Sequence, residues 1–209
     1  MNTLNAPPLE TPLWLASRSP RRRALLESAG VPLRVCPAGI DDADLAVAPV
    51  PPRQWVMALA YLKARWVADA LRARTPPAAG TVLGADTVCV HDGRVLGQPR
   101  DAAHAGAMLR VLRGTTHETI TGVCLLDSTC DARWTLVDAA QVAIGAIGDA
   151  EIDAYVASDA WRGKAGGYNL QDRLDAGWPI RCDGDPATVM GLPMRRLSSW
   201  LERWRGSAA

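Results

Sequence analysis

The sequence predicts a fold that mixes helices and strands, of the α/β or α+β class. Three observations lead to this prediction. Short apolar runs bounded by turn residues indicate strands, longer segments with apolar residues at helical spacing indicate helices, and an extended hairpin lies near the centre of the chain. With 209 residues, the chain can form one sizeable core or two small lobes around a cleft. The sequence contains no internal repeat and no linker long enough to separate domains.

The first half of the chain is expected to begin with a frayed leader. Beyond the leader, Ser19 is a suitable helix N-cap, Pro20 suits the first helical position, and Gly30 is a suitable stop. In order, the expected elements are a leader over 1–12, a strand over 13–17, a helix over 20–30, a strand over 32–40, a loop over 41–52 and a long amphipathic helix over 53–74.

The second half is expected to open with a hairpin, because Asp92 and Gly93 form a turn signal between two apolar runs. Asp101 suits the N-cap of the next helix, and Gly114 suits its end. In order, the expected elements are a hairpin over 81–99, a helix over 100–114, antiparallel strands over 116–128 and 132–147, a helix over 149–158, a glycine-rich segment over 162–172 and a closing amphipathic helix over 190–204.

Composition argues against several classes of protein. The formal net charge is only +1, so the chain as a whole is not a polybasic nucleic-acid binder, and any anion site must be local. Five scattered cysteines without a CxxC pair disfavour a disulfide framework or a structural zinc site and favour a reducing cytosol. No secretory signal opens the chain, and no apolar run approaches the ~20 residues of a membrane helix. We therefore expect a cytoplasmic protein without nucleic-acid or membrane partners.

The stretch ASRSPRRR, residues 16–23, places arginines where a helix begins. A helix N-terminus carries partial positive charge and normally favours acids, so this arrangement is unfavourable unless an anion binds there. Free backbone N–H groups at the turn and guanidinium groups beside them suit a ligand with several phosphates. The alternative is a solvated helix face, which is the usual fate of a charge run. We favour phosphate binding, because surface charge usually avoids the unfavourable end of the helix dipole. The motif GxxxxGK[ST] is absent, so the site is not of the Walker type.

Asp86 interrupts an apolar strand in VLGADTVCV. A lone carboxylate buried there would be costly without partners, which makes it a candidate metal ligand or general base. The alternative is an aspartate at a strand end that bonds its own turn, helped by Gly84. Its position, its apolar flanks and the following Thr87 favour a functional role.

Three further features each allow two interpretations. Lys63 lies on an otherwise apolar helix and either reaches solvent or serves a site. The acids Asp41, Asp42 and Asp44 could help to hold Mg²⁺ or are only solvated. In GKAGGYNLQD, glycines permit close approach to a ligand, Lys164 supplies a charge and Gln171 could contact a base edge; the alternative is a mobile surface loop. The three histidines match no zinc spacing and are expected to be structural or at the surface.

Taken together, these motifs resemble the Maf family of nucleoside triphosphate pyrophosphatases. The resemblance extends from about Leu13 to Leu201 and rests on ordered segments: LASRSPRRRALLESAGV, GIDD, LAYLKA, LGADTVCV, GKAGGYNLQD and VMGLP. It implies a mixed twisted α/β sheet in two lobes around a cleft, related to that of inosine-triphosphate pyrophosphatases, within a single domain over 13–205. It also implies a homodimer that cleaves a nucleoside triphosphate to the monophosphate and pyrophosphate with Mg²⁺ or Mn²⁺.

The resemblance assigns roles to individual positions. Asp86 would accept the proton of the attacking water, and Asp86 and Asp42 would hold the metal. The phosphate-binding positions fall on Ser17, Arg21, Arg22, Lys63 and Lys164. The positions that separate subfamilies fall on Arg21, Thr87 and Gln171, and this combination is similar to the branch that acts on dTTP and UTP. The branch that favours 7-methyl-GTP is the second candidate.

Three positions depart from the family pattern. Gln98 stands where lysine is usual, which removes a positive charge near the expected phosphates. Asp172 stands where glycine follows LQ, with an extended segment after it, and Asp42 is one methylene shorter than the usual glutamate. These departures leave open another modified nucleotide as substrate, or a weakly catalytic nucleotide-binding regulator of cell division.

Overall fold

The structure, a computed structural model, describes residues 13–40 and 50–207. The leader over 1–12 and the acidic loop residues 41–49, Asp42 among them, lie outside the described residues. The described part contains a seven-stranded sheet with the order β2-β1-β3-β5-β6-β7, in which β4 pairs with β3. Its strands are β1 Leu13–Leu15, β2 Leu33–Val35, β3 Thr81–His91, β4 Arg94–Leu96, β5 Thr115–Asp127, β6 Arg133–Ile144 and β7 Ile180–Asp183.

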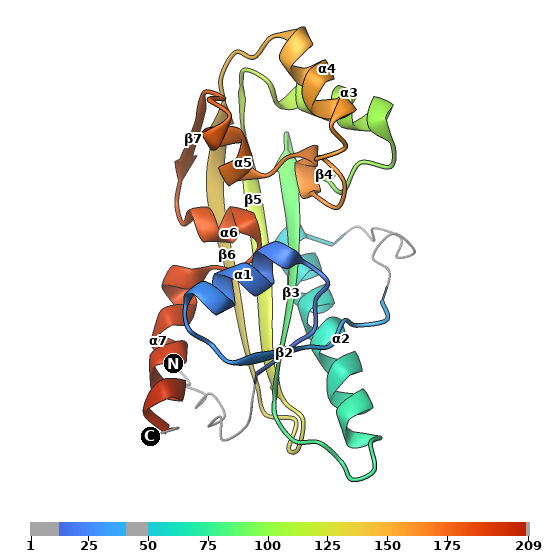
Figure 1. Ribbon diagram of the computed structural model, residues 1–209, viewed down its shortest axis with the longest axis vertical. Helices are drawn as coiled ribbons and strands as arrows, with labels where there is room; N and C mark the ends of the chain where they lie inside the picture. Colours follow the sequence, from blue (N-terminus) through green and yellow to red (C-terminus); the bar gives the residue numbers. More distant parts are fainter. Residues whose placement is uncertain (1–12, 41–49, 208–209) are drawn as a thin grey trace. The chain divides into compact units, whose positions relative to one another are not determined.

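The sheet is mixed, which confirms the predicted class. Strand β1 runs parallel to β2 and β3, whereas β4 pairs with β3, and β7 with β6, in antiparallel register. The helices that accompany it are α1 Pro20–Ser28, α2 Pro52–Arg72, α3 Ala102–Leu112, α4 Asp149–Ala157, α5 Leu170–Asp175, α6 Pro186–Met190 and α7 Met194–Ser207, with a 3₁₀ turn η2 at Ala165–Gly167 (Figure 1).

The chain forms two compact units. Unit 1 contains the described parts of Met1–Asp86, Thr121–Asp138 and Gly191–Ala209, and unit 2 contains Thr87–Ile120 and Ala139–Met190. Strands β3, β5 and β6 contribute residues to both units. The break in β3 falls directly after Asp86, so the predicted site residues are divided between the two units.

Unit 1 packs helices on both faces of its strands. Alternate strand residues belong to different cores: Leu15 and Leu83 pack with α1 and α7, whereas Trp14 and Val82 pack with α2. This is the period of two that a strand imposes on its side chains. Figure 1 shows α1 and α2 on opposite sides of these strands. In unit 2 a separate core joins α3 and α4 to β6 and to three aromatic side chains, Trp161, Tyr168 and Trp178.

Two glycines allow α2 to lie directly on the sheet. A Cβ added to Gly84 of β3 would lie 2.1 Å from the Ala60 carbonyl oxygen, and one added to Gly122 of β5 would lie 2.6 Å from that of Val56. No side chain fits at either position, so glycine is required for this close packing. Both glycines lie inside strands, which is a signal that the sequence offers for close backbone approach.

Local signals place most element boundaries correctly. The Ser19 side chain accepts from the Arg22 N–H at the start of α1, and Asp101 accepts from the His104 N–H at the start of α3. Asp92 and Gly93 adopt positive φ in the turn between β3 and β4, as the hairpin prediction requires.

From Leu170 onward, the chain contains elements that the sequence analysis did not predict: α5, β7 and α6. Asn169 caps α5 by accepting from the N–H groups of Gln171 and Asp172, and Gly177 follows the helix with φ 79°. Strand β7 pairs with β6 from Gln141 to Ile144. These elements have four to six residues each, too few for periodicity to show them.

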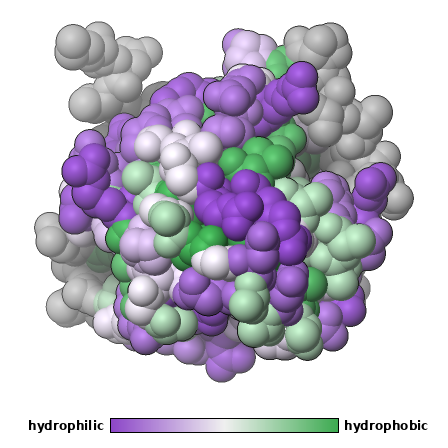
Figure 2. Space-filling view, turned by 90° about the horizontal axis from the view of Figure 1, so that it is seen from above, coloured by the Kyte–Doolittle hydropathy of each residue, from purple (hydrophilic) through white to green (hydrophobic). Residues whose placement is uncertain are grey.

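Within the described parts of the chain, no helix combines the length and the apolar character that crossing a membrane requires. Figure 2 shows one face of the molecule, on which hydrophilic residues prevail and smaller hydrophobic patches lie between them.

Candidate active site

The centre of the candidate site in unit 1 is a buried ion pair between Lys63 and Asp86. Lys63 Nζ lies 2.8 Å from Asp86 Oδ1, and the two side chains are only 11% and 8% exposed. Lys63 therefore does not reach solvent, and the snorkelling alternative is wrong. Asp86 lies in the interior of an eleven-residue strand, so the strand-end alternative is wrong as well.

The local packing explains why these two residues meet. Alternation along β3 puts Gly84 and Asp86 on the face that α2 covers. The atoms nearest to Gly84 belong to Ala60 and Ala64, the residues of α2 that flank Lys63. The missing side chain at position 84 thus brings α2 close enough for the ammonium group to reach the carboxylate two residues further along the strand.

The arginine-rich turn lies at the same level of the sheet as Asp86. In the parallel register Leu15 pairs with Leu83, and the Ala16 N–H donates to the Leu83 carbonyl at 2.8 Å. Residues that follow Leu15 therefore leave β1 beside the stretch of β3 that leads to Asp86. The turn and the carboxylate belong to one unit and one part of it, as an anion site with an acidic centre requires.

The arginines of this turn have different environments. Arg22 is 91% buried; its Nε donates to the Gly191 carbonyl at 3.0 Å and its Nη1 to Ser17 Oγ at 3.2 Å. Ser17 is also buried and accepts from the Ser19 N–H at 3.2 Å. Arg22 therefore ties the start of α1 to the turn before α7. Arg21 is half-buried.

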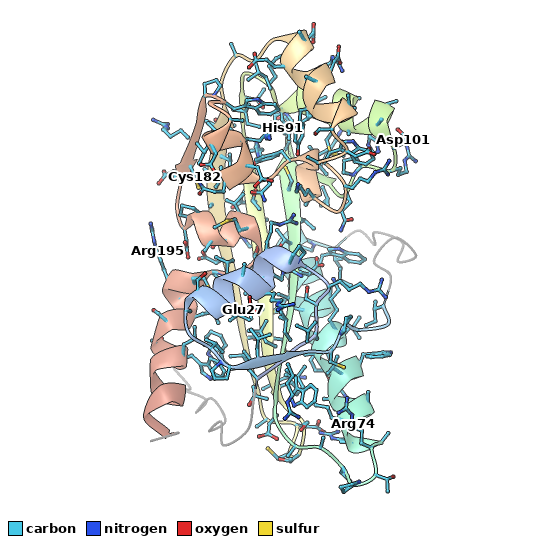
Figure 3. The ribbon with its side chains drawn as sticks, in the orientation of Figure 1. Glu27, Arg74, His91, Asp101, Cys182 and Arg195 are labelled. Atoms are coloured by element: carbon cyan, nitrogen blue, oxygen red, sulfur yellow. The ribbon has the colours of Figure 1, made fainter. Side chains whose placement is uncertain are left out.

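Arg18 and Arg23 fit the solvated-face interpretation, because both are exposed. Arg23 pairs with Glu27 at 2.7 Å one helical turn further along α1, where Figure 3 labels Glu27. Such an exposed pair contributes about 0.3–0.5 kcal/mol. Of the four arginines of this stretch, two are thus exposed, Arg21 is half-buried, and Arg22 is part of the packed interior.

A second group of predicted site residues lies in unit 2. Lys164 Nζ donates to the Ala160 carbonyl and lies 3.5 Å from Asp172 Oδ2. Gln171 is exposed at the start of α5, and its Nε2 donates to Asp175 Oδ1 at 2.8 Å. Thr87 follows Asp86 in β3, is half-buried, and faces the opposite side of the strand.

The central part of the glycine-rich segment is buried and hydrogen-bonded, so it is not at the surface as the loop alternative requires. The Gly166 N–H donates to the Gly97 carbonyl at 3.1 Å, and Gly166 and Gly167 both adopt positive φ. The Tyr168 hydroxyl lies 2.7 Å from His117 Nε2. Burial raises the pKa of Tyr168 and, helped by the charge of His91, lowers the pKa of His117 to about 4, so both groups are neutral at pH 7.

His117 is a residue whose position the sequence analysis did not foresee. It is 2% exposed, in agreement with a structural role, and its ring is in hydrogen-bond contact with Tyr168, which precedes α5. Figure 3 labels His91 and Cys182, which come from other strands of the same unit. No sequence signal joins positions 117 and 168, because their contact depends on how β5 packs against the glycine-rich segment.

Comparison with known proteins identifies the family. The family model described as Maf-like protein matches residues 12–204. The chain is 47% identical over 190 residues to a dTTP/UTP pyrophosphatase of Salinibacter ruber, covering 90% of this chain and 89% of that protein. It is 42% identical over 194 residues to one of Anaeromyxobacter dehalogenans, covering 91% and 93% of the two chains.

The chain belongs to the Maf-like family. The resemblance read from the ordered motifs is thereby confirmed. A dTTP/UTP pyrophosphatase of Bacillus cytotoxicus, 38% identical over 195 residues, covers 93% of this chain and 96% of its own length, so the match to Maf-like relatives extends over almost the entire chain.

Proposed function

We propose that the chain hydrolyses nucleoside triphosphates, dTTP and UTP in preference, to the monophosphate and pyrophosphate. The observation that carries the proposal is the buried Lys63–Asp86 ion pair at the level of the arginine-rich turn. Triphosphate cleavage needs a group that orients the attacking water and cations that neutralise the phosphoryl oxygens. In this part of unit 1, Asp86 is a carboxylate of the first kind, and Lys63 and the arginines are cations of the second kind. The names of the relatives support the choice of nucleotides.

In the proposed mechanism, Asp86 accepts a proton from the water that attacks a phosphorus atom. The Lys63 ammonium orients the carboxylate through Oδ1 and adds positive charge where the phosphates are to bind. Arg21 and Arg22 contribute guanidinium charge, and Ser17 contributes its hydroxyl, at the start of α1. Arg22 has a second task, because its bonds to Gly191 and Ser17 fix the turn that carries these groups.

We also assign roles to residues of unit 2. We assign Lys164 to phosphate binding and, with Arg21, assign Thr87 and Gln171 to nucleotide selection, in line with the branch similar to dTTP/UTP enzymes. The exposed amide of Gln171, at the N-terminal turn of α5, is accessible to a base edge.

A divalent cation, Mg²⁺ or Mn²⁺, fits the donors of unit 1. The described residues contain no group of three or more His, Cys, Asp or Glu side chains that could hold a metal ion by themselves. Mg²⁺ is commonly held by one or two carboxylates together with substrate phosphates, and Asp86 supplies one such carboxylate. We propose Asp42 as the second. When bound, the cation would neutralise charge on the phosphate oxygens.

We further propose a homodimer, a single functional domain over 13–205, and a cytoplasmic location. The family resemblance supports the dimer, and the match of one family model to residues 12–204 supports the single domain. A nucleotide-pool substrate and the scattered cysteines support the cytoplasm. Light scattering coupled to gel filtration measures the mass of the particle and tests the dimer.

The decisive experiment measures pyrophosphate release from dTTP, UTP, CTP, GTP and 7-methyl-GTP with Mg²⁺ and with Mn²⁺. We expect the highest kcat/KM for dTTP and UTP, and loss of ~10²–10⁴-fold in Asp86→Asn, as for removal of a general base. Asp138→Asn is the matched control, because Asp138 is another strand carboxylate of unit 1 and lies 3.5 Å from Arg196. Orthophosphate as the only product, or binding without turnover, would overturn the proposal.

A further inference from the structure

In unit 2, the carboxylate of Asp172 faces the ammonium group of Lys164. The Lys164 side chain is only 13% exposed, and its ammonium group lies between the Ala160 carbonyl and the Asp172 carboxylate, whose side chain is 47% exposed. The ammonium group thus already has a negative partner within its own unit. A phosphate that approached this ammonium group would meet the carboxylate beside it.

Both members of this pair are held in place by backbone contacts. Behind Lys164, the Gly166 N–H donates to the Gly97 carbonyl, and a Cβ on Gly166 would lie 3.3 Å from Cys89 Sγ. Asp172 lies in the first turn of α5, where the Asn169 side chain accepts from its N–H and from that of Gln171. A carboxylate in the first turn is also stabilised by the helix dipole. These contacts fix the backbone near both residues, so the fold places the two side chains within reach of each other.

We propose that Asp172 is an internal competitor for Lys164 that weakens polyphosphate binding. The inference rests on the proposed function insofar as Lys164 binds phosphate. In the free protein the Asp172 carboxylate pairs with the Lys164 ammonium group. A bound polyphosphate must replace the carboxylate as the partner of this ammonium group, and the carboxylate remains close enough to repel the phosphate oxygens. Because the pair is partly exposed, screening reduces the interaction, and the expected penalty in affinity is roughly two- to tenfold.

The test compares KM and kcat for dTTP in the native chain and in Asp172→Asn, with Asp183→Asn as the matched control. Asp183 is an exposed aspartate of unit 2 in β7, and its replacement removes the same charge. We expect KM to fall about two- to tenfold in Asp172→Asn with kcat little changed, and no change in the control. The decrease in KM should shrink as the salt concentration rises from about 0.05 M to about 0.5 M, because salt screens the charge of the carboxylate. A purely structural role predicts a loss, so an unchanged or higher KM overturns the proposal.

A double-mutant cycle shows whether Asp172 acts through Lys164. In a Lys164→Met background, Asp172→Asn should bring no further gain, because the ammonium group for which the carboxylate competes is absent. An equal gain in both backgrounds would mean a general charge effect and would refute the specific pairing. Equal thermal unfolding midpoints of Asp172→Asn and the native chain serve as the control for folding.

Titration calorimetry with inorganic tripolyphosphate separates this inference from the proposed function. If the native chain releases no pyrophosphate from dTTP or UTP, the proposed function fails. The competition is still measured by the dissociation constant of tripolyphosphate, which should be lower in Asp172→Asn. Equal dissociation constants for the native chain, Asp172→Asn and Asp183→Asn would overturn the competition even in an active enzyme.

Discussion

Replacement of Gly84 by alanine is the most direct perturbation of the Lys63–Asp86 pair that leaves both residues in place. The new Cβ would lie 2.1 Å from the Ala60 carbonyl oxygen and 2.7 Å from the Ala64 backbone nitrogen, whereas Cβ contacts below 3.0 Å essentially do not occur. The obstacles are backbone atoms of α2, which cannot rotate away. The helix and β3 must therefore separate by roughly 1 Å.

This separation predicts both a stability and an activity effect. Relief of a glycine in a strand would by itself add about 0.5–1 kcal/mol of stability, whereas overpacking costs about 1–3 kcal/mol. Steric overlap should decide the sign, giving a net loss of about 1–2 kcal/mol. The 2.8 Å contact between Lys63 and Asp86 would lengthen beyond hydrogen-bond range, and a misplacement of ~1 Å can cost about 10²-fold in rate.

Urea unfolding at pH 7 and pyrophosphate release from dTTP measure the two effects. Gly106→Ala in α3 is the matched control, because its Cβ would meet the end of the Arg110 side chain at 2.8 Å and Val156 at an ordinary contact distance of 3.8 Å, but no backbone atom. The control should stay within about 1 kcal/mol of the native chain and retain its rate. A Gly84→Ala protein as stable and as active as the native chain would refute the close-packing argument.

Three further predictions concern buried and exposed charges. Lys63→Met should lower the free energy of unfolding by about 3–5 kcal/mol, because it leaves the Asp86 carboxylate buried without its ammonium partner. Adding Asp86→Asn should restore part of that loss. A loss below about 1 kcal/mol in urea unfolding would contradict the burial of the pair. Burial lowers the pKa of His117 to about 4, below the ~6.5 of an unfolded chain, so stability is complete above pH ~6.5 and falls by roughly 3 kcal/mol as the pH drops toward 4. In His117→Gln, the free energy of unfolding should fall less steeply between pH 6.5 and 4 than in the native chain. An unchanged slope would contradict a lowered pKa of His117. Asp131→Asn removes an exposed partner of Arg65 and Arg72, so it should lower the thermal unfolding midpoint only slightly, and less at high salt than at low salt. Thermal unfolding at two ionic strengths measures this difference.

Much of the secondary structure could be predicted because its signals are local. The Ser19 cap and the Asp92–Gly93 turn depend on residues within four positions of one another, and both occur as expected. The short elements α5 and β7 were missed, because one or two turns of helix and a four-residue strand leave no periodic pattern. Their positions depend on the cap of Asn169 and on pairing with β6.

The candidate site could be predicted in its members but not in its geometry. The order of motifs identified Asp86, Lys63 and the arginine-rich turn as site residues. By its spacing alone, however, Lys63 was equally compatible with a side chain that reaches solvent. Its role follows from Gly84, which lets α2 approach β3, and from a contact across 23 positions of the chain. Arg22 likewise obtains its partner, Gly191, 169 positions away.

The sequence by itself determined the mixed α/β class, the order of the main elements and the family, because caps, turns and motif order are written in adjacent residues. Only the tertiary structure decided which charges are buried, which arginine belongs to the packed interior, and that Asp172 faces Lys164. The physical reason is that burial and ion pairing depend on which helix face meets which strand, and a backbone contact as small as a missing Cβ sets that distance.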